Sequence, residues 1–217
     1  MRENEAPQSR RGHRTASAIT IVSGVPRSGT SMMMKMLDAG GVALLTDGLR
    51  QADEDNPTGY YELDAVKRLG KEEPTWLDEA AGRAVKIISR LLYELPSDRS
   101  YRVLFMHRDL DEVLASQRQM LIRRGEGGRG GDDTADDALK AAFERHVSEV
   151  TAWLRRQANF QVLEVQFADV HADPRSISRC VDDFLDGGLA IDGMAAVVDA
   201  GLYRQRLWGG GSGMHSP

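Results

Sequence analysis

The sequence has one cysteine, few aromatic residues and no long apolar run, and these scarcities exclude several classes of protein. With Cys180 alone, no intrachain disulfide can form, which excludes a disulfide-bonded scaffold and favours a reducing cytoplasm. No apolar segment approaches the roughly 20 residues of a membrane-spanning helix. The formal net charge of −5 argues against a general nucleic-acid-binding protein. We therefore expect a cytoplasmic protein that binds neither membranes nor nucleic acids, and no pattern points to a particular oligomeric state.

The chain is long enough for one domain with an adequate core, and no internal repeat divides its 217 residues. Short β-branched or aliphatic runs alternate with helical patterns, which is typical of βαβ units. The predicted strands are 17–23, 84–88, 102–107 and 160–166. The predicted helices are 30–40, 62–70, 89–95, 109–123, 136–158, 174–186 and 193–200. We predict an α/β domain over 17–206 with a mostly parallel sheet of four or five strands flanked by helices, and disordered ends at 1–16 and 207–217.

Residues 19–37 (ITIVSGVPRSGTSMMMKML) carry the most informative pattern of the chain. A β-branched run enters a turn with Gly24 and Gly29, and Thr30 and Ser31 then open a segment with helical spacing. Backbone N–H groups without intrahelical partners meet the positive end of the helix dipole at such a turn. Arg27 adds a cation inside it. The pattern predicts a single-domain P-loop fold with a phosphate cradle, although such a glycine turn also occurs as a plain strand-to-helix connection.

The loop differs at one position from the loop that binds nucleoside triphosphates. A Walker A loop reads G-x-x-x-x-G-K-[ST], and here Thr30 stands in the place of the lysine. Kinases and ATPases use that lysine with Mg²⁺ against the charge of the β- and γ-phosphates. A donor with a sulfonate on a 5′-phosphate has less charge to neutralise and needs no metal.

A second motif lies at the end of the predicted strand 102–107. His107 and Arg108 follow this strand, Asp109 is placed to cap the next helix, and Ser116 lies two turns into that helix. Because ligands bind outside the carboxyl ends of strands in open α/β sheets, we expect both motifs at one edge. By itself this second pattern also fits a capping aspartate beside a surface arginine.

Together, the PRSGTS string and the Arg108 to Ser116 spacing resemble the sulfotransferases that use PAPS (3′-phosphoadenosine-5′-phosphosulfate). The resemblance implies that the loop residues hold the 5′-phosphosulfate, namely Pro26, Arg27, Ser28, Gly29, Thr30 and Ser31. It also implies that Arg108 and Ser116 hold the 3′-phosphate. The string NPTGYYE at 56–62 and the stretches 173–185 and 199–206 are similar to a bacterial branch of this superfamily. Its cytosolic branch has a later R-K-G segment for which this chain has no clear counterpart.

This resemblance implies transfer of a sulfuryl group from PAPS to a hydroxyl or amine of a small-molecule or carbohydrate acceptor, with PAP as the product and no metal. The sequence leaves two alternatives open: an atypical P-loop kinase or phosphotransferase, and a nucleotide-binding module without turnover. Asp53, Glu54 and Asp55 have no His or Cys beside them and are expected to form a solvated acidic loop rather than a metal site.

The acceptor must lose a proton, and the family uses a glutamate or a histidine as the general base. Glu62, at the end of the NPTGYYE element, is our first candidate, although a carboxylate there also favours a helix N-terminus electrostatically. His107 is the second, but strand alternation points it away from Arg108. We assign charge stabilisation to Arg27. Lys86, on the predicted strand 84–88, is either at the solvated start of that strand or an active-site cation.

Two loops are expected to matter for the acceptor. The long acidic stretch 47–61 follows the phosphate-binding helix and is predicted to border the acceptor pocket, because long loops in compact domains tend to be functional. The glycine-rich stretch 125–133 fits a flexible linker better than a lid over the acceptor.

Overall fold

A parallel sheet of four strands organises the part of the chain that the structure describes. The structure is a computed structural model that describes residues 18–49, 59–123, 125, 133–199 and 201. Strands β1 (Ile19–Gly24), β2 (Ala84–Lys86), β3 (Tyr101–His107) and β4 (Phe160–Gln166) lie in the order β2-β1-β3-β4. All three pairings are parallel. The prediction of an α/β fold with a parallel sheet is therefore confirmed.

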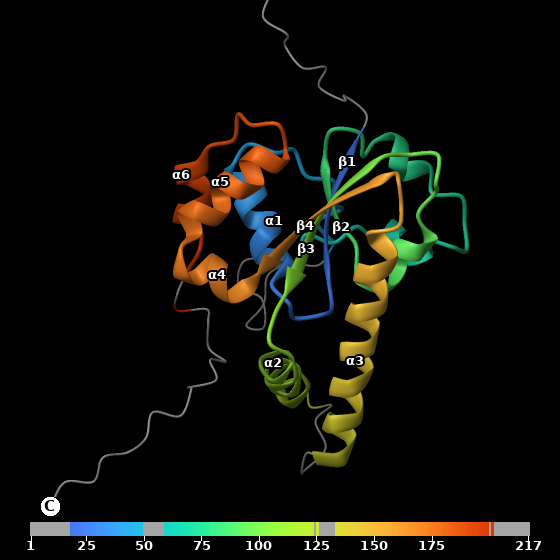
Figure 1. The fold of residues 1–217 in the computed structure, drawn as a ribbon, viewed down its shortest axis with the longest axis vertical. Coiled ribbons are helices and arrows are strands. Elements are labelled where there is room, and N and C mark those ends of the chain that lie inside the picture. The colour runs from blue at the N-terminus through green and yellow to red at the C-terminus, as the bar shows by residue number, and fades with distance from the viewer. Residues whose placement is uncertain (1–17, 50–58, 124, 126–132, 200, 202–217) are drawn as a thin grey trace, which may run out of the picture.

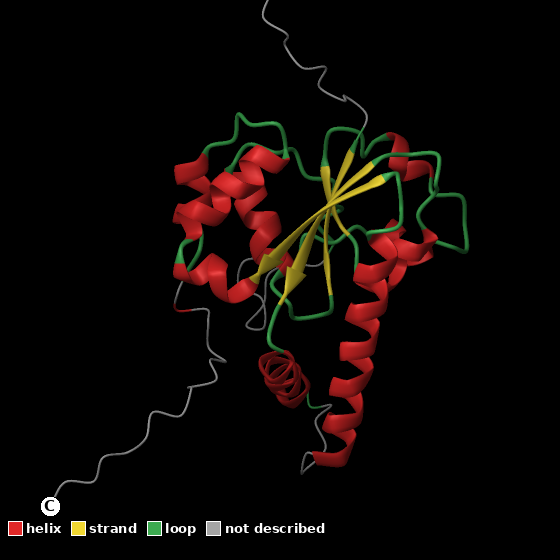
Figure 2. Ribbon diagram, in the orientation of Figure 1, coloured by secondary structure: helices red, strands yellow, loops and turns green. Residues whose placement is uncertain are grey.

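Helices cover both faces of this sheet (Figures 1 and 2). One face carries α1 (Thr30–Ala39), α4 (Phe167–Ala172), α5 (Pro174–Phe184) and α6 (Ile191–Ala196). The other carries the 3₁₀ helices η1 (Asp64–Arg68), η2 (Thr75–Asp78) and η3 (Ser89–Glu94), together with the carboxyl-terminal part of α3 (Asp133–Leu154). Helix α2 (Leu110–Arg123) lies beyond the tip of β3.

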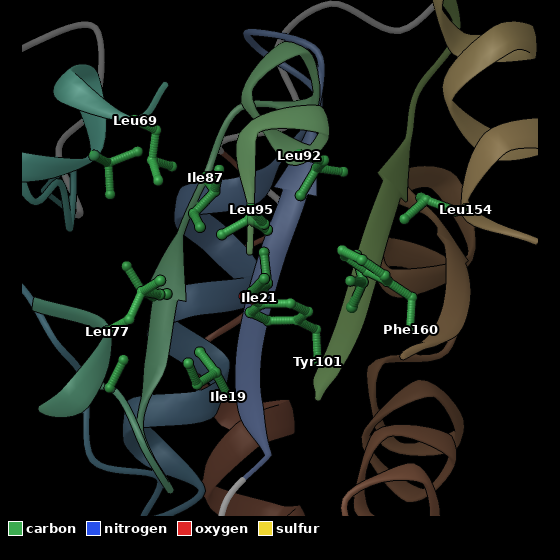
Figure 3. Packing of buried hydrophobic residues seen from close by; sticks show 14 of the residues in the cluster. Ile19, Ile21, Leu69, Leu77, Ile87, Leu92, Leu95, Tyr101, Leu154 and Phe160 are labelled. Carbon is green, nitrogen blue, oxygen red and sulfur yellow. The ribbon is translucent and has the colours of Figure 1, made fainter. Parts of the chain in front are cut away.

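Strand alternation divides the apolar core into two layers. On β1, β2 and β3, odd-numbered residues such as Ile21, Val85 and Phe105 pack against the 3₁₀ helices and α3. Figure 3 shows part of this layer around Tyr101 and Phe160. Even-numbered residues such as Val22 and Leu104 pack against α1, α5 and α6 on the opposite face. Both faces are buried, which explains why these strands are nearly continuous apolar runs.

The same alternation assigns the last residue of each strand to a face. Lys86 ends β2 on the α1 face, whereas His107 ends β3 on the α3 face. The loop 25–29 follows β1, which lies between these two strands. The carboxyl edge of the sheet therefore has different side chains on its two sides.

Two predictions about helices are corrected, and one short helix was not predicted. Residues 62–70 and 89–95 do not form α-helices: they contain the 3₁₀ helices η1 and η3. Gly70, with φ 77°, follows the first and Pro96 follows the second, so neither segment is long enough for stable α-helical turns. Helix α4 was not predicted because its six residues continue from β4 without any turn signal.

Helix α3 packs on the core only through its carboxyl-terminal part. Val150 and Leu154 are buried in the core, and Val147 packs against it. Leu139 and Phe143 remain partly exposed. The amino-terminal half of α3 extends past the carboxyl edge of the sheet (Figure 1). Among the described residues, no helix is both long and apolar enough to span a bilayer.

Tyr101 provides a pH-dependent test of the first core layer. Its ring is 1% exposed, and its hydroxyl donates to the Pro96 carbonyl at 2.9 Å. Burial raises the pKa of Tyr101 to about 12. Since the unfolded tyrosine ionises near pH 10, its protonated form stabilises the fold fully below pH 10, and this contribution is lost as the pH rises to about 12. Urea unfolding should show a steeper loss of stability over this interval in wild type than in Tyr101→Phe; equal slopes would contradict it.

Candidate functional site

The loop after β1 has a backbone that its glycines make possible. Gly24 and Gly29 have positive φ angles of 151° and 100°. A Cβ at Gly24 would lie 2.7 Å from the Met106 carbonyl oxygen, and one at Gly29 would lie 2.5 Å from Cδ2 of the Phe167 ring. Arg27 is also left-handed, with φ 69°, a conformation that costs a non-glycine residue about 1 kcal/mol or more. The loop is therefore tightly packed and locally strained.

Helix α1 begins directly after this loop with features that suit an anion. Its N-cap is Gly29, and within the described part of the chain no side chain caps it. Its first turn contains no acidic residue that would offset the positive end of the helix. The hydroxyls of Ser23 and Ser28 are fully buried and lack hydrogen-bond partners among the described atoms. Unpaired buried polar groups of this kind are typical of a site that a ligand or water completes.

Helix α2 holds the two arginines of the predicted site. Arg27 Nε donates to Ser116 Oγ at 2.9 Å, across 89 residues of sequence. Arg108 Nε donates to Glu112 Oε2 at 3.0 Å, and Arg108 Nη1 donates to the Arg27 carbonyl at 3.2 Å. Asp109 caps α2 through the backbone N–H groups of residues 111 and 112, as predicted. The structure thus brings Arg27, Arg108 and Ser116 together.

Phe167 closes this cluster from the α4 side. The Arg108 guanidinium lies over the Phe167 ring, 4.2 Å from its centroid. The same ring faces Gly29, which explains why a side chain at position 29 would collide with it. Sequence analysis missed Phe167, and the only available signal was its position at the carboxyl end of β4.

Glu62 and Lys86 form a second cluster on the α1 side of the loop. Lys86 Nζ lies 3.5 Å from Glu62 Oε1 and 3.4 Å from Ser31 Oγ, and it donates to the Tyr60 carbonyl. The Lys86 side chain is 9% exposed. Lys86 therefore lies at the end of its strand and against the start of α1, not at a solvated strand start. Through it, Glu62 is connected to the start of α1.

The two tyrosines beside Glu62 have mainly packing roles. Tyr60 is 5% exposed and lies beneath Lys86, whose Nζ is 5.9 Å from the ring centroid. Tyr61 packs against the core layer of α1, and burial raises its pKa above the usual value.

His107 lies on the opposite side of the sheet from Lys86. Its Nε2 is 3.2 Å from Glu164 Oε2, and its ring packs against Phe105. Burial lowers the pKa of His107, and Glu164 offsets part of this effect. His107 lines a pocket of about 290 Å³ together with Val25, Met106, Arg108, Leu110, Glu144, Val147 and Ser148. An imidazole that lines a pocket is placed to accept a proton from a small ligand, so His107 stays a candidate base.

A further histidine contact escaped sequence analysis. His146 Nε2 lies 2.8 Å from Oγ of Ser89, which is 2% exposed, and burial lowers the pKa of His146. The Tyr93 ring meets the imidazole edge-on. This pair gives the buried Ser89 hydroxyl a partner and joins α3 to η3, so we assign it a structural role.

Several predicted features lie outside the described residues. They are the acidic residues Asp53 to Asp55, the first three residues of the NPTGYYE string (56–58), the glycine-rich stretch apart from Gly125 and Asp133, and the two ends of the chain. Across the described ranges, no group of three His, Cys, Asp or Glu residues is arranged to hold a metal ion. The metal-free chemistry stays a prediction.

The sequence matches no protein-family model and no curated protein. Solved structures do match the fold, and one of them is the sulfotransferase domain from the curacin biosynthetic pathway. That comparison has a TM-score of 0.46 and 13% sequence identity, and covers 79% of this chain and 75% of the other. At this identity neither site residues nor an activity carry over, so function has to be argued from the site of this chain.

Gly29→Ala tests how tightly the loop is packed. The new Cβ would collide with the Phe167 ring, and the alanine would have to adopt a positive φ. The free energy of unfolding should therefore fall by about 2–4 kcal/mol. Gly41→Ala is the matched control: its φ is 90°, but a Cβ there meets no atom within 4 Å. That variant should lose only about 1 kcal/mol. Equal losses in urea unfolding would mean that contact with Phe167 does not constrain the loop.

Proposed function

We propose that this protein is a cytoplasmic PAPS-dependent sulfotransferase that transfers a sulfuryl group to a hydroxyl or amine of a small-molecule or carbohydrate acceptor. The observation that carries the proposal is the convergence of Arg27, Arg108 and Ser116 beside the uncapped start of α1. The PRSGTS string and the Arg108 to Ser116 spacing each resemble the superfamily independently. Their meeting at one point is what a shared nucleotide site requires.

The residues of the loop would receive the donor's 5′-phosphosulfate. The N–H groups at the start of α1 and the Arg27 guanidinium supply positive charge where oxygens of the phosphate and sulfonate would lie. Lys86 adds an ammonium group beside Ser31, on the other side of the loop from Arg108. The N–H groups and these two cations can offset the negative charge that develops on the oxygen between phosphorus and sulfur as the bond from that oxygen to sulfur breaks.

Glu62 is proposed as the general base. In the transfer, the acceptor oxygen or nitrogen forms a bond to sulfur, the bond between sulfur and the bridging oxygen breaks, and PAP leaves with the bonding electrons. The acceptor's proton passes to the carboxylate. Glu62 suits this role because Lys86 connects it to the start of α1, where the sulfonate would be held. His107 remains the alternative on the other side of the sheet.

One observation favours a different donor. The ammonium of Lys86 lies 3.4 Å from Ser31 Oγ, so a lysine approaches the loop from the neighbouring strand although Thr30 takes the Walker position. A phosphotransferase could use this lysine against a β- or γ-phosphate. The two functions differ in the nucleotide that they bind.

Thermal shift with two nucleotides separates these functions. A ligand that binds only the folded state raises the unfolding temperature, so PAP should stabilise the wild-type protein more than ATP with Mg²⁺ does. Arg27→Ala should weaken PAP about tenfold or more, because one charge-assisted contact is worth roughly 1.5–3 kcal/mol. Arg83→Ala removes an exposed arginine at the opposite edge of the sheet and should leave PAP binding unchanged. Stabilisation by ATP with Mg²⁺ alone would favour the phosphotransferase.

Turnover is the second part of the same test. A library of hydroxyl and amine acceptors, incubated with labelled PAPS, should yield at least one sulfated product. PAP binding without any product would indicate the nucleotide-binding module.

Glu62→Gln tests the assignment of the base. The change keeps the shape of the side chain and removes the proton acceptor, so kcat should fall by roughly 10²–10⁴. PAP affinity, measured by calorimetry, should stay near wild type. A fall in PAP affinity with little change in kcat would instead make Glu62 a counter-ion of Lys86. Full turnover in Glu62→Gln would move the role to His107, for which His107→Asn is the corresponding variant.

A further inference from the structure

The guanidinium of Arg108 already donates hydrogen bonds from Nε and from Nη1. An arginine binds a phosphate most strongly through two parallel N–H groups, either Nε with Nη2 or Nη1 with Nη2. Nε donates to Glu112 Oε2 at 3.0 Å. Nη1 donates to the Arg27 carbonyl at 3.2 Å. An anion therefore binds the edge formed by Nε and Nη2 through both N–H groups only by replacing Glu112.

The two partners differ in how easily they can be replaced. The Arg27 carbonyl belongs to the strained loop, whose shape depends on that contact. The Glu112 carboxylate is at the end of a flexible side chain, one helical turn from Arg108. The side chains of Arg108 and Glu112 are 9% and 6% exposed, so water screens the attraction between them only weakly. Phe167 holds the plane of the guanidinium and keeps its Nε edge turned toward α2.

We propose that Glu112 is an internal competitor for the anionic group that binds Arg108. In the unliganded protein its carboxylate neutralises Arg108, and an incoming phosphate takes over the Nε edge as Glu112 withdraws. This inference rests on the proposed function for the identity of the ligand, since the 3′-phosphate of PAPS and PAP is the group assigned to Arg108. It adds a specificity-determining residue that touches no acceptor and takes no part in proton transfer.

The consequence is a site that is stable when empty and does not hold its product too tightly. Without Glu112, the nearly buried cation of Arg108 would lose the carboxylate that is paired with it, which is costly to the fold. With Glu112 present, the binding of a 3′-phosphate includes the free-energy cost of breaking the ion pair between Arg108 and Glu112. The competitor therefore lowers the affinity for nucleotides that carry a 3′-phosphate and leaves the affinity for those without it nearly unchanged.

Glu112→Gln separates charge from shape. The amide oxygen can still accept a hydrogen bond from Arg108 Nε, so Arg108 keeps its orientation while the competing charge is removed. Asp111→Asn is the matched control: it removes one carboxylate from the adjacent position of the same helix, where Asp111 pairs with Lys140 instead. Circular dichroism should show that both variants are folded.

Calorimetry with three ligands then provides the test. PAP should bind Glu112→Gln about tenfold more tightly than wild type, while adenosine 5′-phosphosulfate, which lacks the 3′-phosphate, should change less than twofold. Asp111→Asn should change neither by more than about twofold, since its charge is exposed to solvent. Inorganic phosphate is the third ligand and should gain affinity in Glu112→Gln only when Arg108 is present, so the gain should vanish in Glu112→Gln/Arg108→Ala.

The outcomes distinguish this inference from the proposed function. Suppose that neither nucleotide binds wild type, but that inorganic phosphate binds Glu112→Gln more tightly in a manner that depends on Arg108. The role of Glu112 as a competitor would then be supported, and the assignment of PAPS as the donor would be wrong. If PAP binds wild type but Glu112→Gln binds it equally or more weakly, the competitor is overturned and the donor assignment stands. Equal gains for both nucleotides, or an equal gain in Asp111→Asn, would also overturn it, because a general change in charge would then explain the effect.

Discussion

The candidate site depends on the hydrogen bonds by which helix α2 fixes two guanidinium groups. Ser116 accepts from Arg27 and Glu112 accepts from Arg108, from positions one turn apart on the same helix face. Arg108 in turn donates to the carbonyl of Arg27, whose φ is 69°. A left-handed arginine is unfavourable by itself, so the loop keeps this shape because a helix encoded some 80 residues later fixes both ends of the arginine.

The loop has two different environments on its two sides. On the α1 side, Lys86 and Glu62 form an ion pair beside Ser31. On the α3 side, His107 lines a pocket together with apolar residues such as Val25 and Val147. The alternation of β2 and β3 creates this difference, because their last residues have opposite parity. The two sides of this one loop are therefore chemically distinct.

The sequence predicted the sheet well because its signals are local. Runs of β-branched residues identified four strands within a few residues of their observed bounds, and Asp109 identified the start of α2. The Arg27 to Ser116 contact was only half predicted: both residues were assigned to a ligand, whereas they bind each other in the unliganded protein. No local pattern indicates such a pairing. The contacts of Glu112 and Phe167 were not predicted for the same reason, because they depend on how α2 and α4 pack.

The position of β1 between β2 and β3 has a consequence for the order of folding. The loop that follows β1 is made early by the ribosome, whereas its hydrogen-bond partners Arg108 and Ser116 are made more than 80 residues later. Closing a contact over 89 residues carries the entropic cost of a long loop, which is repaid only when β1 has already paired with β3. We therefore expect the loop to reach its final shape only after β1 and β3 have paired. A chain that ends before α2 would contain the PRSGTS string without the residues that hold its loop in place.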